Sequence, residues 1–298
     1  MEKKEKKAAK RLTVFTPTYN RAGTLHRTYE SLCMQQSQNF IWSIVDDGST
    51  DNTHELVKKW QEAGLIDISY VQQPNGGKMR AFNHGVQLCQ TELFMCLDSD
   101  DWLTSPTSIT NLLNFWDQQK DISQRTDICG MISFKRIIGR VGTYKVTGPT
   151  MIMDDLVENS TECENTTTFK TEVLRKYPFP VIEGEKFITE GVVYDRIDQH
   201  YQYLIFPEYT QTCEYQDDGY TCKGVNLVIN SPRGYQLYYN QRMVVAKKGF
   251  IYNAKMYVAT SLLAGDLFFL QKANRKFLCL LAIPLGYIQY RRLKHGHY

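Results

Sequence analysis

Apolar and polar positions follow one another through the first third of the chain with the periods of strands and helices. Short runs of apolar, β-branched and aromatic residues predict strands over residues 12–17, 40–45, 66–72 and 93–97. The segments between them place apolar residues three or four positions apart, which predicts helices over 22–37, 52–63 and 78–90. Strands that alternate with helices predict a parallel α/β sheet with right-handed crossovers.

The pattern changes beyond residue 125. Residues 127–134 and 140–146 predict two further strands, and a mixed, tyrosine-rich region then runs to about residue 245. From about residue 246 the pattern is helical.

The charge of the chain is segregated along its length. The 298 residues are 42% apolar and 22% charged, as expected for a globular protein, and the net charge is only +3. Residues 1–11 nevertheless carry +4 and residues 255–298 carry +6, which leaves −7 on the body between them. We interpret residues 1–11 as a basic flexible tail. Because a nucleic-acid-binding protein is usually basic across its working face, we expect no nucleic-acid partner.

Cysteine spacing and the chain start bear on the cellular compartment. The eight cysteines include no C-x-x-C pair, and several lie in apolar runs typical of buried, reduced thiols. The basic N-terminal segment is not followed by an apolar stretch long enough for a secretion signal. These features predict a cytoplasmic protein.

The C-terminal segment combines an apolar run with a basic flank. Residues 277–290 form an uncharged stretch of 14 residues, shorter than the roughly 18–20 that span a bilayer, and Arg291, Arg292 and Lys294 follow it. This pattern favours a helix lying on the inner face of the cytoplasmic membrane, and hence a peripheral membrane protein. The alternative is a helix packed on the core or on a second copy of the chain in a homodimer.

Polar, loop-forming sequences follow each of the four predicted strands, at residues 16–21, 46–49, 75–78 and 98–101. Ligands of open parallel sheets bind outside the carboxyl ends of the strands, so we expect these segments to form one site. The three carboxylates Asp98, Asp100 and Asp101 would repel one another unless a divalent cation such as Mg²⁺ or Mn²⁺ relieved them. The alternative is a solvated acidic loop.

The remaining strand-end residues suit a nucleoside diphosphate. Gly77 and Lys78 open a helix whose N-terminus favours an anion, although neither a Walker A loop nor a G-x-G-x-x-G fingerprint is present. Tyr19 can stack on a base, and Asp47 can accept the imino N–H of a uracil-like edge. A half-buried packing role for Tyr19 is the alternative.

Four motifs, in this order, resemble family 2 inverting glycosyltransferases with the GT-A fold, of the bacterial cell-surface and capsular polysaccharide type. They are TPTYNR, VDDGSTDNT, NGGK-x-x-A-x-N-x-G and LDSDDW, within residues 12–120. The resemblance implies an α/β protein with a Rossmann-like, mostly parallel central sheet flanked by helices and a helical C-terminal extension. It divides the chain into a catalytic domain, 12–245, and a helical region, 246–298. The catalytic domain comprises a nucleotide half, 12–120, and an acceptor half, 121–245.

The resemblance also implies a nucleotide-sugar donor, a Mn²⁺ or Mg²⁺ ion, and inversion at the anomeric carbon. The pocket residues suit a UDP-sugar. The implied donor-binding residues are Thr16, Pro17, Tyr19, Asn20, Arg21, Asp47, Gly77, Lys78, Asp98 and Ser99. The implied metal ligands are Asp100 and Asp101, because family members differ in which acid of such a run holds the ion.

Inversion requires a base that deprotonates the acceptor hydroxyl. In the family this base commonly belongs to an E-D motif that follows the acidic run. Glu190 occupies that place before a helical pattern, but Gly191 replaces the usual Asp. Glu185 is the competing candidate, and a helix N-terminal carboxylate is the structural alternative for Glu190.

These features predict transfer of one sugar to a saccharide or lipid-linked acceptor. The Q-x-x-R-W motif of processive synthases is absent, which argues against chain extrusion. A nucleotidyltransferase would need a Gly-rich loop after the first strand, where TPTYNR stands. A catalytically inactive glycan- or nucleotide-binding protein on the same scaffold remains the alternative from another functional class.

Overall fold

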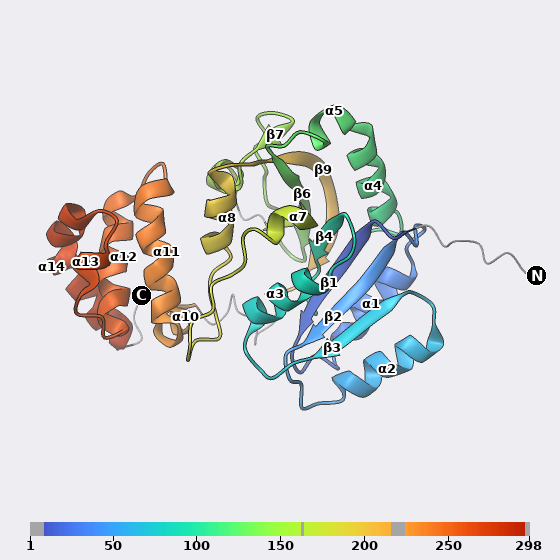
Figure 1. The fold of residues 1–298 in the computed structure, drawn as a ribbon, viewed down its shortest axis with the longest axis horizontal. Helices are drawn as coiled ribbons and strands as arrows, with labels where there is room; N and C mark the ends of the chain where they lie inside the picture. Colours follow the sequence, from blue (N-terminus) through green and yellow to red (C-terminus); the bar gives the residue numbers. More distant parts are fainter. Residues whose placement is uncertain (1–8, 162–163, 216–223, 296–298) are drawn as a thin grey trace, which may run out of the picture.

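The computed structural model describes residues 9–161, 164–215 and 224–295. Among these residues, nine strands form one mixed sheet, in which eight follow the order β3-β2-β1-β4-β8-β6-β9-β5 and β7 pairs with β9 (Figure 1). The parallel half contains β1 (Leu12–Thr18), β2 (Phe40–Asp46), β3 (Ile68–Gln72) and β4 (Leu93–Cys96). The other half contains β5 (Trp102–Leu103), β6 (Ile128–Ile137), β7 (Thr150–Met151), β8 (Glu164–Lys170) and β9 (Gln202–Cys213).

Both faces of β1, β2 and β4 are largely buried, whereas the edge strand β3 is partly exposed. Neighbouring residues of a strand point to opposite faces, so Val14 and Phe15 lie in two different apolar clusters. The helices that accompany the sheet are α1 (Leu25–Cys33), α2 (Thr53–Ala63), α3 (Lys78–Leu88), α4 (Ser108–Gln118), α5 (Lys120–Ser123), α6 (Met153–Asn159), α7 (Thr171–Leu174) and α8 (Gly191–Asp198). This arrangement confirms the predicted α/β fold with helices flanking the sheet.

The C-terminal helices form a lobe beside the sheet (Figure 1). They are α10 (Val225–Asn230), α11 (Pro232–Val245), α12 (Phe250–Leu263), α13 (Phe269–Lys272) and α14 (Lys276–Lys294). Tyr239 and Met243 of α11 share an apolar core with α12 and α14, so the helical packing begins before residue 246. None of the described helices is both long and apolar enough to cross a membrane.

The prediction of a second strand after residue 125, over 140–146, is wrong. Residues 140–146 make only an isolated bridge, between Thr143 and Thr161. Because β6 is already paired on one side with β8 and on the other with β9, it offers no free edge for a hairpin partner. Tyr144 instead stacks on Phe134, with ring centroids 3.7 Å apart.

The other elements follow the predictions closely. The helix expected over 22–37 is confirmed in its central part, Leu25–Cys33, and the strand expected over 127–134 continues to Ile137. The described cysteines are free thiols, as predicted, whereas Cys163 and Cys222 lie outside the described residues. Most of the predicted basic tail, residues 1–8, also lies outside them.

Candidate active site

The loops that follow β1 and β2 are tied together at the carboxyl edge of the sheet. Asn20 adopts a left-handed conformation, with φ of 53°, and its backbone N–H donates to Ser49 Oγ at 2.9 Å. The backbone N–H of Thr50 donates to Asn20 Oδ1 at 2.7 Å. Asn20 therefore joins two of the four predicted site segments.

Asp47 organises the turn that begins α3. Its carboxylate is nearly buried and accepts the backbone N–H groups of Gly76 at 2.8 Å and Gly77 at 2.6 Å, as well as the Gln73 side-chain amide at 2.8 Å. The structure thus gives Asp47 a positioning role at the helix start. Its contact with a nucleobase stays a prediction.

Residues of the NGGK-x-x-A-x-N-x-G motif hold a distant segment against α3. Asn83 exchanges two hydrogen bonds of 2.9 Å with the backbone of Phe179, and Arg80 donates to the Ile182 carbonyl at 3.0 Å. Gly77 has φ of +96°, and a Cβ added there would lie 1.8 Å from the Lys186 carbonyl oxygen. Only glycine allows this close approach, which brings the segment carrying both candidate bases to the nucleotide half.

Lys78 connects the acidic strand end to the first candidate base. Its ammonium lies 2.9 Å from Asp98 Oδ1 and 3.2 Å from Glu190 Oε1. Burial opposes the charge on Lys78, but Asp98 and Glu190 outweigh burial and raise the lysine pKa well above its usual value. Groups that are far apart in the sequence, on α3, after β4 and before α8, thus form one charged cluster.

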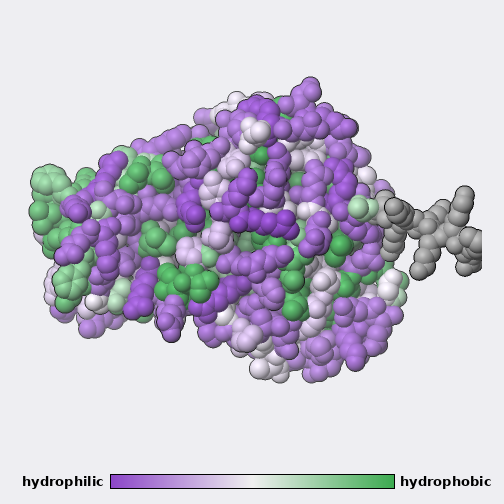
Figure 2. Space-filling model, in the orientation of Figure 1, coloured by the Kyte–Doolittle hydropathy of each residue, from purple (hydrophilic) through white to green (hydrophobic). Residues whose placement is uncertain are grey.

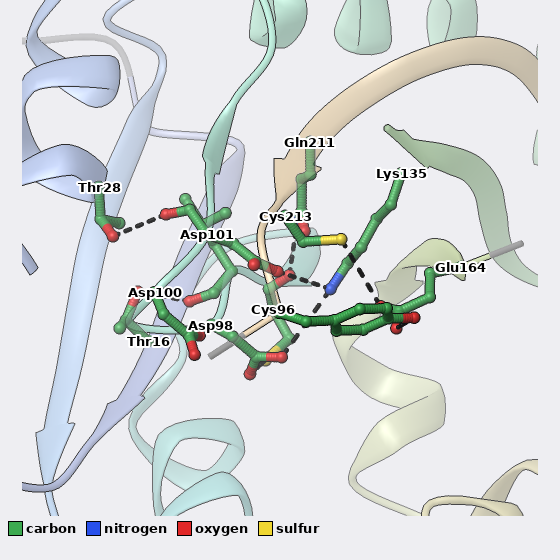
Figure 3. A network of polar contacts seen from close by, with 12 residues as sticks. Thr16, Thr28, Cys96, Asp98, Asp100, Asp101, Lys135, Glu164, Gln211 and Cys213 are labelled. Carbon is green, nitrogen blue, oxygen red and sulfur yellow. Dashed lines mark hydrogen bonds and ion pairs between the residues drawn. The ribbon is translucent and has the colours of Figure 1, made fainter. Parts of the chain in front are cut away.

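A second lysine, which the sequence reasoning missed, lies on the other side of the acidic run. Lys135 of β6 reaches to 2.8 Å from Asp101 Oδ2 and 3.8 Å from Asp98 Oδ2 (Figure 3). Its only signal in the sequence is a charged residue at the end of the apolar run ICGMISF. That signal does not say which residues the lysine meets.

The three carboxylates have different electrostatic environments. Burial favours the neutral form of Asp98, but the ammonium groups of Lys78 and Lys135 outweigh it and hold the pKa of Asp98 well below its usual value. Burial raises the pKa of Asp101 to about 6, against the opposing effect of Lys135. Burial and the nearby Asp98 charge raise the pKa of Asp100, and Arg21 partly counters them.

Asp100 is the acid best placed to receive a cation. Unlike Asp98 and Asp101, it has no lysine partner in the described part of the chain, and it is only half-buried. No cluster of three or more His, Cys, Asp or Glu side chains among the described residues could hold a metal ion alone. Mg²⁺ is commonly held by one or two carboxylates plus substrate phosphates, so a single available acid fits that chemistry. Asp101 fits less well, because its carboxylate is buried and paired with Lys135.

The other predicted donor residues divide by exposure. Tyr19 is 47% exposed at the sheet edge, whereas Pro17 and Ser99 are buried. Thr16 is fully buried, donates to the Leu97 carbonyl at 2.8 Å and accepts the Trp42 indole N–H at 2.9 Å. The Thr16 hydroxyl is therefore engaged within the protein, and a contact of Thr16 with the nucleotide-sugar stays a prediction.

The two candidate bases have different partners. The Glu185 carboxylate accepts the backbone N–H groups of Arg233 at 2.7 Å and Gly234 at 2.8 Å, and so caps the start of α11. Glu190 stands at the start of α8 with its side chain 45% exposed. A Cβ at Gly191 would lie 2.7 Å from the Tyr238 ring, so the glycine leaves room for α11 where the family motif has Asp.

The fold and this acidic strand-end site define a GT-A glycosyltransferase architecture. A model of the family described as glycosyl transferase family 2 matches residues 13–177, more than half of the chain. The chain therefore belongs to this family.

Relatives and solved structures agree with this assignment. TarP, a poly(ribitol-phosphate) beta-N-acetylglucosaminyltransferase of Staphylococcus aureus, is 32% identical over 110 residues, which are 36% of this chain and 33% of TarP. Glycosyltransferase GlyA of Streptococcus pneumoniae is 31% identical over 113 residues, which are 38% of this chain and 16% of GlyA. The matched segment thus spans a third or less of either relative.

Two structural neighbours extend over almost the whole chain. S. aureus TarS 1–349 in complex with UDP-GlcNAc has a TM-score of 0.62 at 14% identity and covers 97% of this chain and 93% of its own. The mannosyltransferase PcManGT from Pyrobaculum calidifontis, in complex with GDP-Man and Mn²⁺, has a TM-score of 0.54 at 17% identity and covers 97% and 83%. At these identities the likeness establishes the fold.

Replacing Gly77 by alanine tests the packing of α3 on the distant segment. The added Cβ collides with the Lys186 carbonyl, so Gly77→Ala is expected to lower the free energy of unfolding by about 1–3 kcal/mol. Gly23→Ala is the matched control, because a Cβ there has no atom within 4 Å. Urea unfolding of both variants measures the difference. Equal midpoints would contradict the described contact.

Proposed function

We propose that this protein is a metal-dependent inverting glycosyltransferase that moves one sugar from a nucleotide-sugar to an acceptor hydroxyl in surface polysaccharide or glycolipid assembly. The observation that carries the proposal is the charged cluster around Lys78, which lies 2.9 Å from Asp98 and 3.2 Å from Glu190. This cluster places a candidate general base beside the strand end where nucleotide ligands of such sheets bind.

The donor end of the site suits a UDP-sugar. The exposed Tyr19 ring is available to stack on a base, and the N-terminus of α3, with Lys78, favours a diphosphate. TarS, which shares the fold, is described with UDP-GlcNAc and with UDP. These observations support a nucleotide-sugar donor with uridine as its nucleoside.

Asp100 would hold the Mn²⁺ or Mg²⁺ ion together with the donor. When bound, such an ion stabilises the charge that develops on the leaving diphosphate. Lys78, which is paired with Asp98 of the same acidic run, adds a fixed positive charge near the proposed diphosphate position.

Glu190 is the proposed base. The acceptor hydroxyl attacks the anomeric carbon from the face opposite the diphosphate, the new carbon–oxygen bond forms as the bond to the diphosphate breaks, and the hydroxyl proton passes to the Glu190 carboxylate. The half-exposed Glu190 side chain can meet an acceptor, whereas Glu185 is committed to the start of α11.

We also propose that α14 docks on the inner face of the cytoplasmic membrane. One face of this helix packs on α12 through small residues, and Gly286 approaches Val258 so closely that a Cβ would lie 2.5 Å away. The opposite face exposes large apolar side chains, namely Phe277, Leu280, Leu281, Leu285 and Ile288. Figure 2 shows hydrophobic residues gathered at the end of the molecule that the C-terminal helices form.

The charge around this face matches an anionic lipid surface. Arg291, Arg292 and Lys294 follow the apolar face in the last turns of α14, and Arg275 and Lys276 stand at its beginning. An apolar stripe with basic ends is typical of a helix that lies in the headgroup region of a membrane. This location would bring the enzyme to a lipid-linked acceptor.

Replacing Glu190 or Glu185 by glutamine, one at a time, tests which of them is the general base. Glu190→Gln is expected to lower the transfer rate by about 10²–10⁴-fold, because it removes the proton acceptor, with donor affinity within a few-fold of the parent. Glu185→Gln is expected to retain transfer and to lose about 1 kcal/mol of stability, because it weakens the cap of α11. Product formation, donor titration and thermal unfolding report the three quantities. The reverse pattern would assign the base to Glu185.

Asp100→Asn tests the proposed metal ligand. The variant is expected to lose Mn²⁺-stimulated turnover by about 10²-fold or more, because charge on the leaving diphosphate is no longer stabilised. Chelation of metal by EDTA should have the same effect on the parent protein. Asp121→Asn, at an exposed position in α5, is the matched control. Full Mn²⁺-stimulated activity in Asp100→Asn would contradict the assignment.

Polar substitutions on α14 test membrane docking without removing the helix. Replacing Phe277, Leu281 and Ile288 by serine is expected to abolish cosedimentation with vesicles containing anionic phospholipid, with the protein still folded because these side chains are exposed. The control replaces Leu65 and Val141, exposed elsewhere, by serine. Unchanged cosedimentation of the α14 variant would contradict docking. If the α14 variant instead changed from a dimer to a monomer, the exposed face of α14 would be assigned to contact with a second copy of the chain.

A further inference from the structure

Two lysines from other segments, Lys78 and Lys135, form ion pairs with acids of the run 98–101. Lys78 Nζ lies 2.9 Å from one oxygen of Asp98, and Lys135 Nζ lies 3.8 Å from the other. Lys135 also lies 2.8 Å from Asp101. The side chains of the two lysines are only 18% and 11% exposed, so neither charge is well screened by solvent. Asp98 and Asp101 are thereby paired with ammonium groups, although Lys78 is shared with Glu190. Asp100 has no lysine within ion-pair distance in the described part of the chain.

The two lysines weaken the electrostatic attraction of the free protein for a metal ion. An approaching divalent cation is attracted by the carboxylates, but it is repelled by two ammonium groups fixed at the same acids. A nucleoside diphosphate reverses this balance, because its phosphate oxygens attract both the metal ion and the ammonium groups. The metal ion and the diphosphate should therefore strengthen each other's binding. The effect should be larger than at a site that had Asp100 but lacked the two lysines.

We propose that Lys135, with Lys78, offsets part of the negative charge of the free site, so that the metal ion binds strongly only together with the nucleoside diphosphate. Lys135 is then a positioning residue that holds Asp98 and Asp101 through their ion pairs. The inference rests on the proposed function, since it assumes a metal ion at Asp100 and a diphosphate donor. Thermodynamic linkage requires the effect to be reciprocal, so the metal must tighten diphosphate binding by the same factor.

The test measures Mn²⁺ binding with and without UDP on the full chain. Free Mn²⁺ is followed by electron paramagnetic resonance, with MnCl₂ alone and then with saturating UDP. For the parent protein, UDP is expected to tighten Mn²⁺ binding by about 10–100-fold. Lys135→Gln is expected to tighten the binding of Mn²⁺ alone by about tenfold and to reduce the effect of UDP by the same factor. Lys135→Arg keeps the charge and should behave as the parent.

Lys135→Gln leaves the buried Asp101 carboxylate without its partner and could therefore destabilise the fold. A second variant keeps the inference testable in that case. Combining Lys135→Gln with Asp101→Asn removes one charge of each sign, so the binding of Mn²⁺ alone should return to the weak parental value. Circular dichroism establishes folding of each variant. Unchanged or weaker binding of Mn²⁺ alone to folded Lys135→Gln would overturn the inference. Complete loss of Mn²⁺ binding in the double variant would also overturn it, because Asp101 would then be the main ligand.

The outcome is distinguishable from failure of the proposed function. If Asp100→Asn binds Mn²⁺ with UDP as tightly as the parent, the metal site lies elsewhere and the proposed function fails in its metal step. If Asp100→Asn loses Mn²⁺ but Lys135→Gln leaves the coupling to UDP unchanged, the proposed function stands and only the role of Lys135 fails.

Discussion

The site depends on the ion pairs that Lys78 makes with Asp98 and Glu190, at 2.9 and 3.2 Å. Carboxylates gathered at one strand end repel one another, and burial adds the cost of removing them from water. Lys78 offsets both effects on one side of Asp98, and Lys135 offsets them on the other. The two lysines therefore favour the ionised form of Asp98 at this partly buried edge of the sheet.

A continuous set of contacts links this edge to the C-terminal helices. Asp47 holds the turn at Gly77, and Gly77 receives the backbone of Lys186. Glu185, one residue earlier, caps α11, while Gly191 lies against Tyr238 of the same helix. The candidate base Glu190 therefore stands between two contacts with the helical lobe. If α14 docks on a membrane, the base is held in a defined position relative to that surface.

The parallel half of the sheet and its strand-end motifs were predictable from sequence because their signals are local. Each strand is a short apolar run followed within a few residues by its functional loop, and parallel order brings those loops to one edge. The wrong strand at 140–146 had the right local composition. What excluded it was the pairing of β6 on both sides, which involves β8 and β9 from later in the chain.

The rest of the site depends on contacts between distant segments. Lys135 lies 34 positions from Asp101, and no spacing rule relates them. Glu185 and Glu190 lie five residues apart in the sequence, and their contacts with distant segments separate them, since Glu185 caps α11 and Glu190 pairs with Lys78. Thr16 belongs to a recognisable motif, yet the indole of Trp42 and the carbonyl of Leu97 occupy its hydroxyl. A motif thus identifies the residues near a ligand, whereas packing decides which of them face it.

The central claim is a single displacement assisted by Glu190, and the anomeric configuration of the product tests it most directly. The measurement is the anomeric proton coupling of the transferred sugar by NMR, with an α-linked UDP-sugar as donor and the product isolated before any further reaction. The account predicts a β-linked product, because the acceptor attacks opposite the diphosphate. An α-linked product would contradict it.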